Sequence, residues 1–437
     1  MRIAIFAHEF PSPSETFVLD HAIGLVERGH DVAVFADAPR AGTPLPPEFE
    51  AHRLDARSFH PDIPASHGRR VRNAIVPALE LGRHRLPLAL RSLDAMRHGH
   101  DALSLRLLYW SALLARQPPF DLIHCHFGPI GDWVATLREI GAIRGRLVTT
   151  FHGVDVSALL GGAPQRYRQL FARGDLFLAV SDHWRARLAA LGCDEARLLT
   201  QRMGVDLARF RFRARRPEVG APLRILTVGR LVEKKGVDWA LRAVARACGQ
   251  GVSLRHTIVG DGPMRAALER EALGLGLERV VEFLGWRSRA EVASLMDRHD
   301  VILAPSVTSD AGDQEGIPVT LMEAMAAGMI VVSTRHSGIP ELVESGITGF
   351  LAPERDAASL AHFLCHLADA PAEFERMGLA ARGKIEREYD RAKLDRRLEA
   401  IYARLLATET NARDEIGLSP RAARDAHAPS GVPSSSE

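Results

Sequence analysis

Short runs of apolar residues alternate with longer amphipathic stretches along the chain. In the first half these runs cover residues 2–7, 31–37, 121–127, 147–152, 175–181 and 198–203, and in the second half 223–229, 254–260, 280–284, 301–305, 330–333 and 350–352. Most are unbroken aliphatic or β-branched runs, as expected for parallel strands that are buried on both faces. The alternation of such strands with helices predicts βαβ units and doubly wound α/β sheets.

Residues 211–222 interrupt this alternation. The stretch is charged, carries two prolines and lacks hydrophobic periodicity, reading FRARRPEVGAP from Phe212 onward. We interpret it as a linker between a first domain, 1–210, and a second, 222–378, because a chain of 437 residues exceeds what one hydrophobic core usually supports. Two such halves facing each other would create a cleft at the carboxyl ends of both sheets, where open α/β folds bind ligands.

A second interruption is the stretch 61–116, which we interpret as a helical insertion. It contains nine arginines but, apart from Asp62 at its edge, only three acidic residues. Four apolar residues stand at helical spacing: Leu103, Leu107, Trp110 and Leu114. The insertion either packs on the first domain with solvated arginines, or forms a cationic, apolar-striped surface that sits on anionic lipid.

Composition narrows the class of protein. Hydrophobic residues make up 46% and charged residues 25%, as in soluble globular proteins, and the net charge of +2 argues against a dedicated nucleic-acid binder. The four cysteines lie far apart, which excludes a zinc ribbon, makes a disulfide framework unexpected and favours a reducing cytosol. The first residues, MRIAIFAHEF, begin directly with a strand-like run, so we expect no secretory signal, and no apolar run is long enough to predict a transmembrane helix.

In the first half, the turn after the first strand reads FPSPSETF. Ser12 and Glu15 fit an S-x-x-E capping box with Pro13 at the first helical position, which predicts a helix start there. The hydroxyls of Ser14 and Thr16 would then face the cleft. The alternative is that the motif only caps a helix and has no role in binding.

Two histidine motifs follow strands of the same half, HCHFG at 124–128 and TFHGVD at 150–155. His124 and His126 point to one face of a strand, which would permit a metal site, but no third ligand cluster accompanies them in the sequence, so we expect no metal. His152 ends a strand at a glycine turn and would lie at the edge of the cleft. Such a histidine is as often structural as functional.

The second half carries a pair of cations after its first strand, in GRLVEKKG at 229–236. The turn is neither a Walker loop nor a G-x-G-x-x-G fingerprint. It nevertheless supplies two cations for phosphate oxygens: Arg230 with a planar fork of N–H donors, and Lys235 with a compact positive charge. Gly236 would allow a ligand to approach the backbone closely. The alternative is that this segment is a basic turn exposed to solvent, with no ligand. VGDGP at 259–263 follows the next strand, and its glycines would let the backbone approach a planar ligand.

The stretch DQEGIPVTLMEAMAAG at 313–328 places Glu315 before a helix and Glu323 inside it. With Pro318 in the first turn, the free N–H groups of that helix start attract anions. Glu315 could simply complement the helix dipole and Glu323 could lie on a solvated face. Combined with the two cations, however, the pattern fits a diphosphate with a hydroxyl-bearing ring on either side. We infer that the ligand is a nucleotide sugar.

Together, these motifs resemble glycosyltransferase family 4, which has the GT-B fold. The resemblance runs from residue 2 to about 407, and FPSPSETF, IHCHFG and GDQEGIPVTLMEAMAAG are most similar to exopolysaccharide enzymes of the colanic-acid type. The motifs that carry it, in family order, are FHGVD, RMGVD at 202–206, GRLVEKKG, VGDGP and the E-x7-E pair. Many family members have a Gly-Gly loop after the first strand, where this chain has prolines and serines, so the resemblance leaves the contacts of that loop open.

The resemblance implies a role for each motif. Glu323 would hold the ribose hydroxyls and Glu315 the donor sugar, while His152 would sit beside the transferred sugar. Arg230 and Lys235 would bind the diphosphate and offset the charge that develops on the leaving group. The implied catalytic residues are His152, Glu315, Arg230 and Lys235. The implied donor-binding residues are Arg230, Lys235, Asp261, Gly262, Leu284, Glu315, Gly316, Ile317, Pro318, Val319 and Glu323. On the acceptor side we place Ser14, Glu15, Thr16, His126 and Asp155.

The implied reaction is retaining transfer of a hexose from a UDP- or GDP-sugar to a lipid-linked or oligosaccharide acceptor. No cofactor and no metal are expected, because the two cations would neutralise the diphosphate. A final helix, about 379–405, would cross back to the first domain, and the tail, 406–437, ends in APSGVPSSSE and is expected to be disordered. The enzyme would be cytoplasmic and would visit the inner face of the membrane.

Two other classes remain open. An epimerase or a phosphorylase would keep the fold without this transfer; a phosphorylase needs a pyridoxal lysine, and neither Lys384 nor Lys393 lies in a strand-end loop. A non-catalytic sugar-nucleotide-binding scaffold is the other class. A scaffold need not keep both glutamates and both cations, which favours the transferase.

Overall fold

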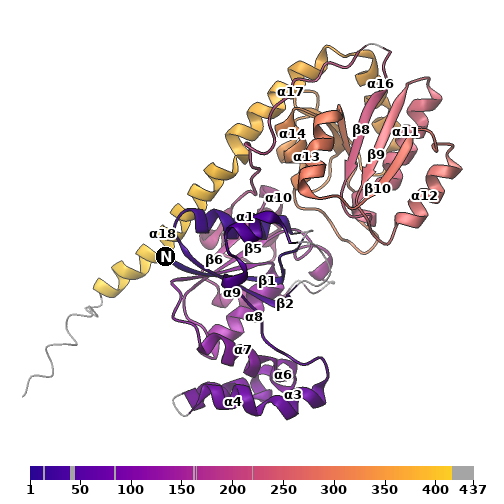
Figure 1. The fold of residues 1–437 in the computed structure, drawn as a ribbon. Coiled ribbons are helices and arrows are strands. Elements are labelled where there is room, and N and C mark those ends of the chain that lie inside the picture. Colours follow the sequence, from indigo (N-terminus) through magenta and orange to yellow (C-terminus); the bar gives the residue numbers. More distant parts are fainter. Residues whose placement is uncertain are drawn as a thin grey trace, which may run out of the picture. The chain divides into compact units, whose positions relative to one another are not determined.

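The computed structural model describes residues 1–12, 15–39, 45–82, 85–160, 163, 165–218 and 220–415. The chain divides into two compact units, Met1–Asp395 and Arg396–Glu437. Both sheets lie in the first unit, as Figure 1 shows in indigo to magenta for the first sheet and in pink to orange for the second.

The first sheet has seven parallel strands in the order β3-β2-β1-β4-β5-β6-β7. Their bounds are Arg2–Phe10 (β1), Asp31–Pro39 (β2), Ser58–Phe59 (β3), Leu122–His126 (β4), Arg146–Phe151 (β5), Leu176–Ala179 (β6) and Leu198–Thr200 (β7). The helices that follow these strands are α1 (Thr16–Glu27), α2 (Pro47–Ala51), α8 (Gly128–Glu139), α9 (Arg168–Arg173) and α10 (Asp182–Ala190). The sequence predicted every strand except β3, whose two residues are too few to give a pattern.

The second sheet has six parallel strands in the order β10-β9-β8-β11-β12-β13. Their bounds are Leu223–Val228 (β8), Leu254–Val259 (β9), Val281–Gly285 (β10), Val301–Ala304 (β11), Ile330–Thr334 (β12) and Gly349–Ala352 (β13). The helices are α11 (Val237–Gly249), α12 (Arg265–Gly274), α13 (Arg289–Arg298), α14 (Val319–Ala327), α15 (Ile339–Leu342) and α16 (Ala357–Asp369). The predicted fold class, two doubly wound parallel sheets, is confirmed.

Burial explains why the central strands read as unbroken apolar runs. Every residue of β4, β11 and β12 is buried, because helices cover both faces of each sheet. The carboxyl ends of these strands lead into the loops at 127–128, 305–318 and 335–338. The loop at 305–318 carries Glu315, Gly316, Ile317 and Pro318 of the predicted site, at the strand ends where this class of fold binds ligands.

The insertion is helical, as predicted, and lies between β3 and β4. Its helices are α3 (His67–Asn73), α4 (Ile75–Leu81), α5 (Leu86–Ser92), α6 (Ala95–Leu103) and α7 (Arg106–Ala115). Helices α4, α5 and α6 all pack against α7. Leu107, Trp110 and Leu114 are buried in the core of the first half, whereas Leu103 is 63% exposed. The proposed lipid-facing stripe is therefore wrong for three of its four residues, because α7 is the central helix of the insertion.

The linker carries no helix or strand in its described part, 211–218 and 220–222. It is nevertheless fastened to the second half. The buried guanidinium of Arg215 donates to the carbonyl oxygens of Asp297, Met296 and Ala327 at 2.8–3.1 Å.

The C-terminal region differs from the single helix predicted for 379–405. It forms α17 (Glu373–Lys384), a π-helical turn (Ile385–Tyr389) and α18 (Arg391–Glu415). The break falls where Asp390 forms a β-bridge with Val205, so tertiary pairing interrupts the helical pattern. The disorder predicted for 406–437 is wrong for 406–415, which are helical, and residues 416–437 lie outside the described part of the chain.

Candidate active site

The helix after the first strand does not begin as predicted. α1 starts at Thr16 with Glu15 as its N-cap, and no side chain caps it, so the capping box of Ser12 and Glu15 is wrong. β1 continues to Phe10, and the N–H of Glu15 donates to the carbonyl oxygen of Ser12 at 3.1 Å, so the N-cap lies three residues beyond Ser12. Pro13 and Ser14 lie outside the described residues.

Glu15, the N-cap of α1, is partly buried. One of its carboxylate oxygens is buried without a hydrogen-bond partner. Burial raises the pKa of Glu15, and the nearby charges of His8 and Arg230 oppose that rise. The Arg230 side chain is exposed and Thr16 is partly buried. Glu15 and Arg230, predicted for opposite sides of the site, are thus close enough to interact electrostatically.

The loop after β5 is organised by Asp155. Its carboxylate is fully buried and accepts hydrogen bonds from the backbone N–H groups of Gly128, His152 and Gly153 at 2.9–3.0 Å. Burial raises the pKa of Asp155 to about 6, although these hydrogen bonds act in the opposite direction. Gly153 has a φ of 123°, which only glycine adopts without strain. We therefore expect Asp155, placed on the acceptor side from the sequence, to act by fixing the loop that carries His152.

The His152 ring is held from two sides. It stacks on Phe17 of α1 with ring centroids 4.3 Å apart, and its Nε2 lies 3.1 Å from Nδ1 of His126. Nδ1 of His152 is buried without a hydrogen-bond partner. Burial lowers the pKa of His152 to about 3, so the ring is neutral. His126 and His152 are both buried.

In the second half, the predicted phosphate and sugar residues touch each other. Nζ of Lys235 lies 3.1 Å from Oε2 of Glu315, and Nζ of Lys234 lies 3.0 Å from Asp313 and 3.7 Å from Glu315. The two lysines lower the pKa of Glu315 despite its burial. Lys234 was not predicted, and its only signal in the sequence is its place beside Lys235.

The glycines of these turns serve the packing of the turns themselves. A Cβ on Gly236 would lie 2.0 Å from the carbonyl oxygen of Pro305, and one on Gly260 would lie 1.8 Å from that of Gly229. A Cβ on Gly262 would lie 2.5 Å from the carbonyl oxygen of Leu231. The close approach predicted for a ligand is therefore explained by neighbouring backbone.

The loop before α14 is held by residues that the sequence gave no reason to select. The N–H of Glu315 donates to Nε2 of His336 at 3.0 Å, and the Ser337 hydroxyl donates to the carbonyl oxygen of Glu315 at 2.8 Å. Nδ1 of the buried His336 lies 2.6 Å from a Glu354 oxygen. Only the fold brings β12 and β13 beside this loop. Pro318 is the N-cap of α14, not a residue of its first turn as predicted.

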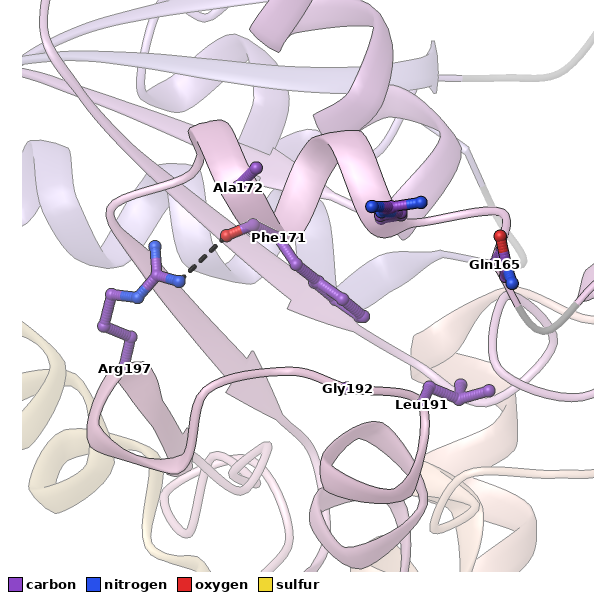
Figure 2. A pocket seen from close by; sticks show the side chains of 7 residues that line it. Gln165, Phe171, Ala172, Leu191, Gly192 and Arg197 are labelled. Atoms are coloured by element: carbon purple, nitrogen blue, oxygen red, sulfur yellow. Dashed lines mark hydrogen bonds between the residues drawn. The ribbon is translucent and has the colours of Figure 1, made fainter.

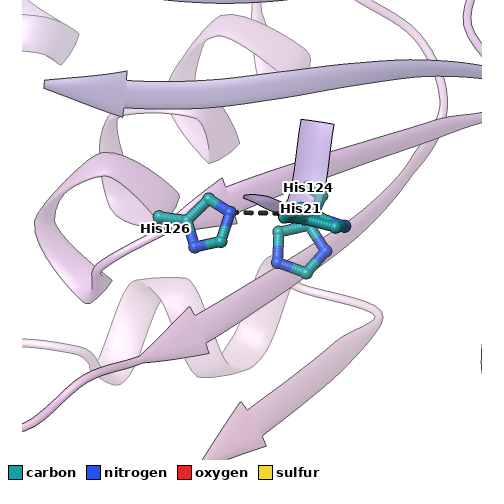
Figure 3. A group of neighbouring side chains, drawn as sticks. All are labelled: His21, His124 and His126. Carbon is teal, nitrogen blue, oxygen red and sulfur yellow. Dashed lines mark hydrogen bonds between the residues drawn. The ribbon is translucent and has the colours of Figure 1, made fainter. Parts of the chain in front are cut away.

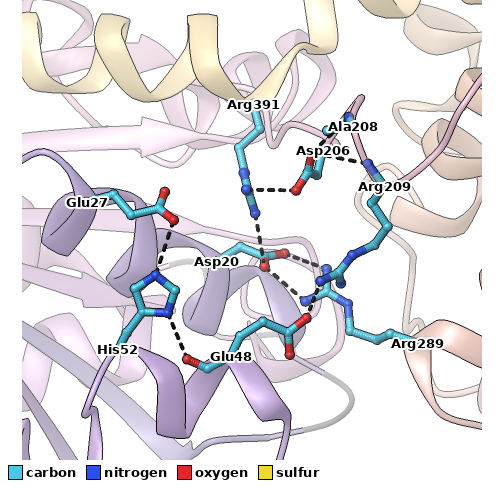
Figure 4. A network of polar contacts seen from close by, with 9 residues as sticks. All are labelled: Asp20, Glu27, Glu48, His52, Asp206, Ala208, Arg209, Arg289 and Arg391. Carbon is cyan, nitrogen blue, oxygen red and sulfur yellow. Dashed lines mark hydrogen bonds and ion pairs between the residues drawn. The ribbon is translucent and has the colours of Figure 1, made fainter.

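Glu323 lies in the second turn of α14, as predicted, and is buried. Its pKa is raised to about 7, chiefly by burial, while the charge of Arg289 opposes the rise. Arg289 itself forms a bidentate ion pair with Asp20 of α1, at 2.9 Å for both contacts. Figure 4 shows this pair within a network that also contains Arg391 and Arg209. Neither Asp20 nor Arg289 was predicted.

The loops of the two halves meet at a pair of glycines. A Cβ on Gly316 would lie 2.6 Å from the carbonyl oxygen of His152, and one on Gly153 would lie 3.0 Å from the nitrogen of Gly316. His152 and Glu315 therefore belong to loops in direct contact. Of the other predicted donor-binding residues, Asp261 is ion-paired with Arg265 at 3.1 Å, and Leu284 is partly buried at the end of β10.

A shallow pocket of about 420 Å³ lies elsewhere, beside α9 and β7 (Figure 2). Its lining residues are Gln165, Arg168, Phe171, Ala172, Leu191, Gly192 and Arg197. None of the predicted site residues lines it, so it is separate from the candidate active site.

Comparison with known proteins identifies the class. The sequence profile for "Glycosyl transferases group 1" matches residues 222–370, and that for "Glycosyltransferase Family 4" matches residues 14–209. The chain belongs to this glycosyltransferase family. It is 38% identical to a "Putative colanic acid biosynthesis glycosyltransferase" of Salmonella typhimurium, covering 92% of this chain and 99% of the relative. It is 37% identical to the "Amylovoran biosynthesis glycosyltransferase" of Erwinia amylovora, covering 93% and 100%.

Solved structures agree on the fold. HepE of Anabaena in complex with UDP and glucose superposes with a TM-score of 0.67 at 19% identity, covering 92% of this chain and 99% of that one. Sucrose-phosphate synthase from Thermosynechococcus elongatus gives a TM-score of 0.67 at 18% identity, covering 93% and 100%. The protein has the GT-B glycosyltransferase fold, as the sequence motifs predicted.

Proposed function

We propose that this glycosyltransferase transfers a hexose, with retention, from a UDP- or GDP-hexose to a lipid-linked saccharide in exopolysaccharide biosynthesis. The observation that carries the proposal is the Lys235–Glu315 contact of 3.1 Å, on a loop that touches the His152 loop. The names of the two relatives mention colanic acid and amylovoran, which are exopolysaccharides. The structure of HepE was solved in complex with UDP-glucose.

The donor would exchange partners with this ion pair. A diphosphate carries the charge that the Glu315 carboxylate now supplies to Lys235, so its binding would free Glu315 to accept hydrogen bonds from sugar hydroxyls. The N–H groups at the start of α14, residues 319–327, would contribute an anion-binding helix end. Glu323, one turn further, would accept from the ribose hydroxyls.

The chemistry needs no protein nucleophile in this proposal. The acceptor hydroxyl attacks the anomeric carbon on the face of the leaving group, the bond from that carbon to the phosphate oxygen breaks, and a phosphate oxygen takes the proton. Arg230 and Lys235 stabilise the charge that develops on the diphosphate. His152 is neutral, because burial lowers its pKa to about 3, and it would contribute a hydrogen bond to the sugar, not a proton.

No metal at the diphosphate is part of this proposal. The acidic loop ahead of Glu315 is its nearest rival, but Asp313 is paired with Lys234 at 3.0 Å and Asp310 with Arg355 at 3.2 Å. Oxygen-preferring cations such as Mg²⁺ would have to displace these pairs. Chelator-treated enzyme should therefore gain no activity from added Mg²⁺ or Mn²⁺, and a strong gain from either would overturn this part.

Product analysis tests the whole proposal. The purified enzyme is incubated with UDP- and GDP-hexoses and a lipid-extract acceptor, and the anomeric configuration of the product is read by NMR. An axial donor linkage should remain axial. Inversion would reject the mechanism. A free isomerised sugar nucleotide without acceptor would indicate the epimerase, and binding without turnover would indicate the scaffold.

Contact with anionic lipid remains part of the proposal. The contact surface would be the outer faces of α3–α6, not the predicted stripe, which lies mostly on α7. No helix among the described residues is long and apolar enough to cross a membrane. The outer faces of α3–α6 expose apolar side chains: Val71, Ile75, Val76, Leu79, Leu86, Leu90, Leu93, Met96 and Leu103. Arg69, Arg72 and Arg85 are exposed among them and form no ion pair within the described residues. Apolar and cationic side chains on one surface are typical of interfacial binding.

Vesicle co-sedimentation tests this contact. Leu79→Ser/Leu86→Ser/Leu90→Ser should sediment less with anionic vesicles than wild type, and wild-type binding should fall as salt is raised. The matched control changes exposed leucines of the second half, Leu273→Ser/Leu379→Ser. Equal sedimentation of all three proteins would leave the insertion as a packed helical subdomain.

A further inference from the structure

Three histidines from two elements converge in the first half. His21 comes from α1, and His124 and His126 come from β4, with their rings turned toward one another (Figure 3). One nitrogen of each ring lies within 4.8 Å of the others, and Nδ1 of His21 is 3.0 Å from Nε2 of His126. The sequence showed only the pair on β4, because α1 is more than a hundred residues away along the chain.

The second nitrogens of the β4 rings are already held. Nδ1 of His126 lies 3.1 Å from Nε2 of His152, and Nε2 of His124 lies 2.8 Å from the hydroxyl of Thr150. Metal-binding histidines have this arrangement, in which a hydrogen bond to the outer nitrogen orients the ring and fixes its tautomer.

His124 and His126 are buried, and His21 is partly buried. Burial lowers the pKa of His21 to about 4 and the pKa values of His124 and His126 well below the usual value. The charges of neighbouring histidines, among them His152, add to this lowering for the two β4 rings. Neutral imidazoles are the protonation state in which histidine binds a metal.

We propose that His21, His124 and His126 bind one divalent transition-metal ion, Zn²⁺ in the first instance. Ring centroids stand 4.6, 4.8 and 5.2 Å apart, close to the spacing of about 5 Å that three imidazoles take around one ion with Zn–N bonds of about 2.0–2.1 Å. The ligand nitrogens, at most 4.8 Å apart, would adjust to separations of about 3.3 Å, which Zn–N bonds of this length set. Three protein nitrogens leave a fourth position for water, and an all-nitrogen site selects against Mg²⁺ and Ca²⁺.

The metal would position His152. An ion on Nε2 of His126 leaves the proton of that ring on Nδ1, which then donates to Nε2 of His152. His152 must in turn carry its own proton on Nδ1, the buried nitrogen that has no partner. The ion thereby makes His152 a hydrogen-bond donor toward the site. This consequence rests on the proposed function, whereas metal binding itself does not.

The first experiment measures the metal directly. Tag-free protein is stripped with chelator, dialysed and titrated with Zn²⁺ and with Co²⁺, whose visible absorption reports nitrogen ligation. We expect one ion per chain, and at least a tenfold loss of affinity in His21→Gln. His21 is the partly buried ligand, so its replacement is the least disruptive, and His362→Gln, an exposed histidine of the second half, is the matched control. Stoichiometric binding that is equal in all three proteins, or no binding above background, would overturn the proposal.

The second experiment separates the ion from the activity. Zn²⁺ should raise the Tm of wild type and of His362→Gln by a few degrees and leave that of His21→Gln unchanged, whatever the enzyme transfers. If transfer is established, the stripped wild type and His21→Gln should share a kcat lowered several-fold with little change in the KM for the donor. A Tm of His21→Gln that rises with Zn²⁺ as much as wild type would contradict the site. A normal Tm response with unchanged kcat would reject only the coupling to His152.

Discussion

The two halves of the protein share one topology and differ in the chemistry at the carboxyl ends of their strands. The first half presents buried, neutral imidazoles, of which His152 and His126 are in contact at 3.1 Å. The second half presents lysines and glutamates, with Lys235 and Glu315 in contact at 3.1 Å. A neutral, hydrogen-bonding side suits hydroxyl-rich sugars, and a cationic side suits a diphosphate, so the division of charge agrees with a nucleotide-sugar donor.

The two glutamates of the second half show how burial and charge decide ionisation. Both are buried to a similar degree, but the adjacent lysines lower the pKa of Glu315, while burial raises that of Glu323 to about 7. The first is an ionised partner of cations, and the second is a carboxyl group that is partly protonated at neutral pH. The difference in pKa between the two glutamates therefore comes from the charges of their neighbours, not from how deeply each is buried.

The largest effect should follow from removing the cations of the second half. Arg230→Ala and Lys235→Ala should each lower kcat/KM by about 100-fold or more, because they act on charge that develops in the transition state. Lys393→Ala, an exposed lysine away from this turn, is the control for loss of a lysine. Near-normal kcat/KM in both site variants would remove this turn from the phosphate site.

Adding one methyl group at Gly316 should disturb the contact between the Glu315 loop and the His152 loop. Gly316→Ala would place a Cβ 2.6 Å from the carbonyl oxygen of His152, and the loops must move apart. We expect kcat/KM to fall by about 30-fold, since displacements near 1 Å misalign reacting groups. Gly274→Ala, where nothing lies within 4 Å of the new Cβ, should be unaffected. Unchanged kinetics in Gly316→Ala would mean that the register of the two loops is not needed for transfer.

The two glutamates should separate in calorimetry with the nucleoside diphosphate alone. Glu323→Gln should weaken its binding by about tenfold, the loss expected for one charged hydrogen bond. Glu315→Gln should leave this affinity nearly intact, because the diphosphate displaces Glu315 from Lys235, and should lower the rate of transfer. Equal losses of affinity in both variants would show that the roles are misassigned.

The smallest effect concerns stability and pH. A carboxyl group with a folded pKa of about 7 and an ordinary pKa of 4.5 contributes stability below pH 4.5 that is lost as pH rises through 7. Glutamine does not titrate, so the variant Glu323→Gln does not lose this stability as pH rises. The Tm of the variant minus the Tm of wild type should therefore increase by a few degrees from pH 5 to pH 8. Glu291→Gln, an exposed glutamate on α13, is not expected to show that rise. A constant Tm difference across this range would mean that Glu323 is ionised in the folded protein at pH 5.

The strands were predictable because their signal is local. Parallel strands buried on both faces must be continuously apolar, and β4, β11 and β12 read that way. The start of α1 was not predictable, since β1 pairs with β2 as far as Phe10 and displaces the helix start from Ser12 to Thr16. The apolar spacing in α7 correctly indicated a helix, but spacing cannot distinguish a face that packs inward from one that meets lipid.

The site was predictable where residues follow strands in short motifs. His152, Lys235 and Glu315 were selected for that reason, and the fold brings their loops together. His336 holds Glu315 from a neighbouring strand end, and Arg289 acts on Glu323 from another helix. Neither has a sequence signal, because their positions depend on which strands are adjacent in the sheet.

The sequence by itself determined the alternation of strands and helices, the family and the cation and carboxylate motifs, because each is written in neighbouring residues. Only the tertiary structure decided which of these groups neutralise one another, which carboxyl group has a raised pKa and which third histidine joins the pair on β4. Ionisation and ligand geometry depend on distances of a few ångströms between residues that can be a hundred or more positions apart. Chain order does not contain those distances, and the packing of helices on the two sheets sets them.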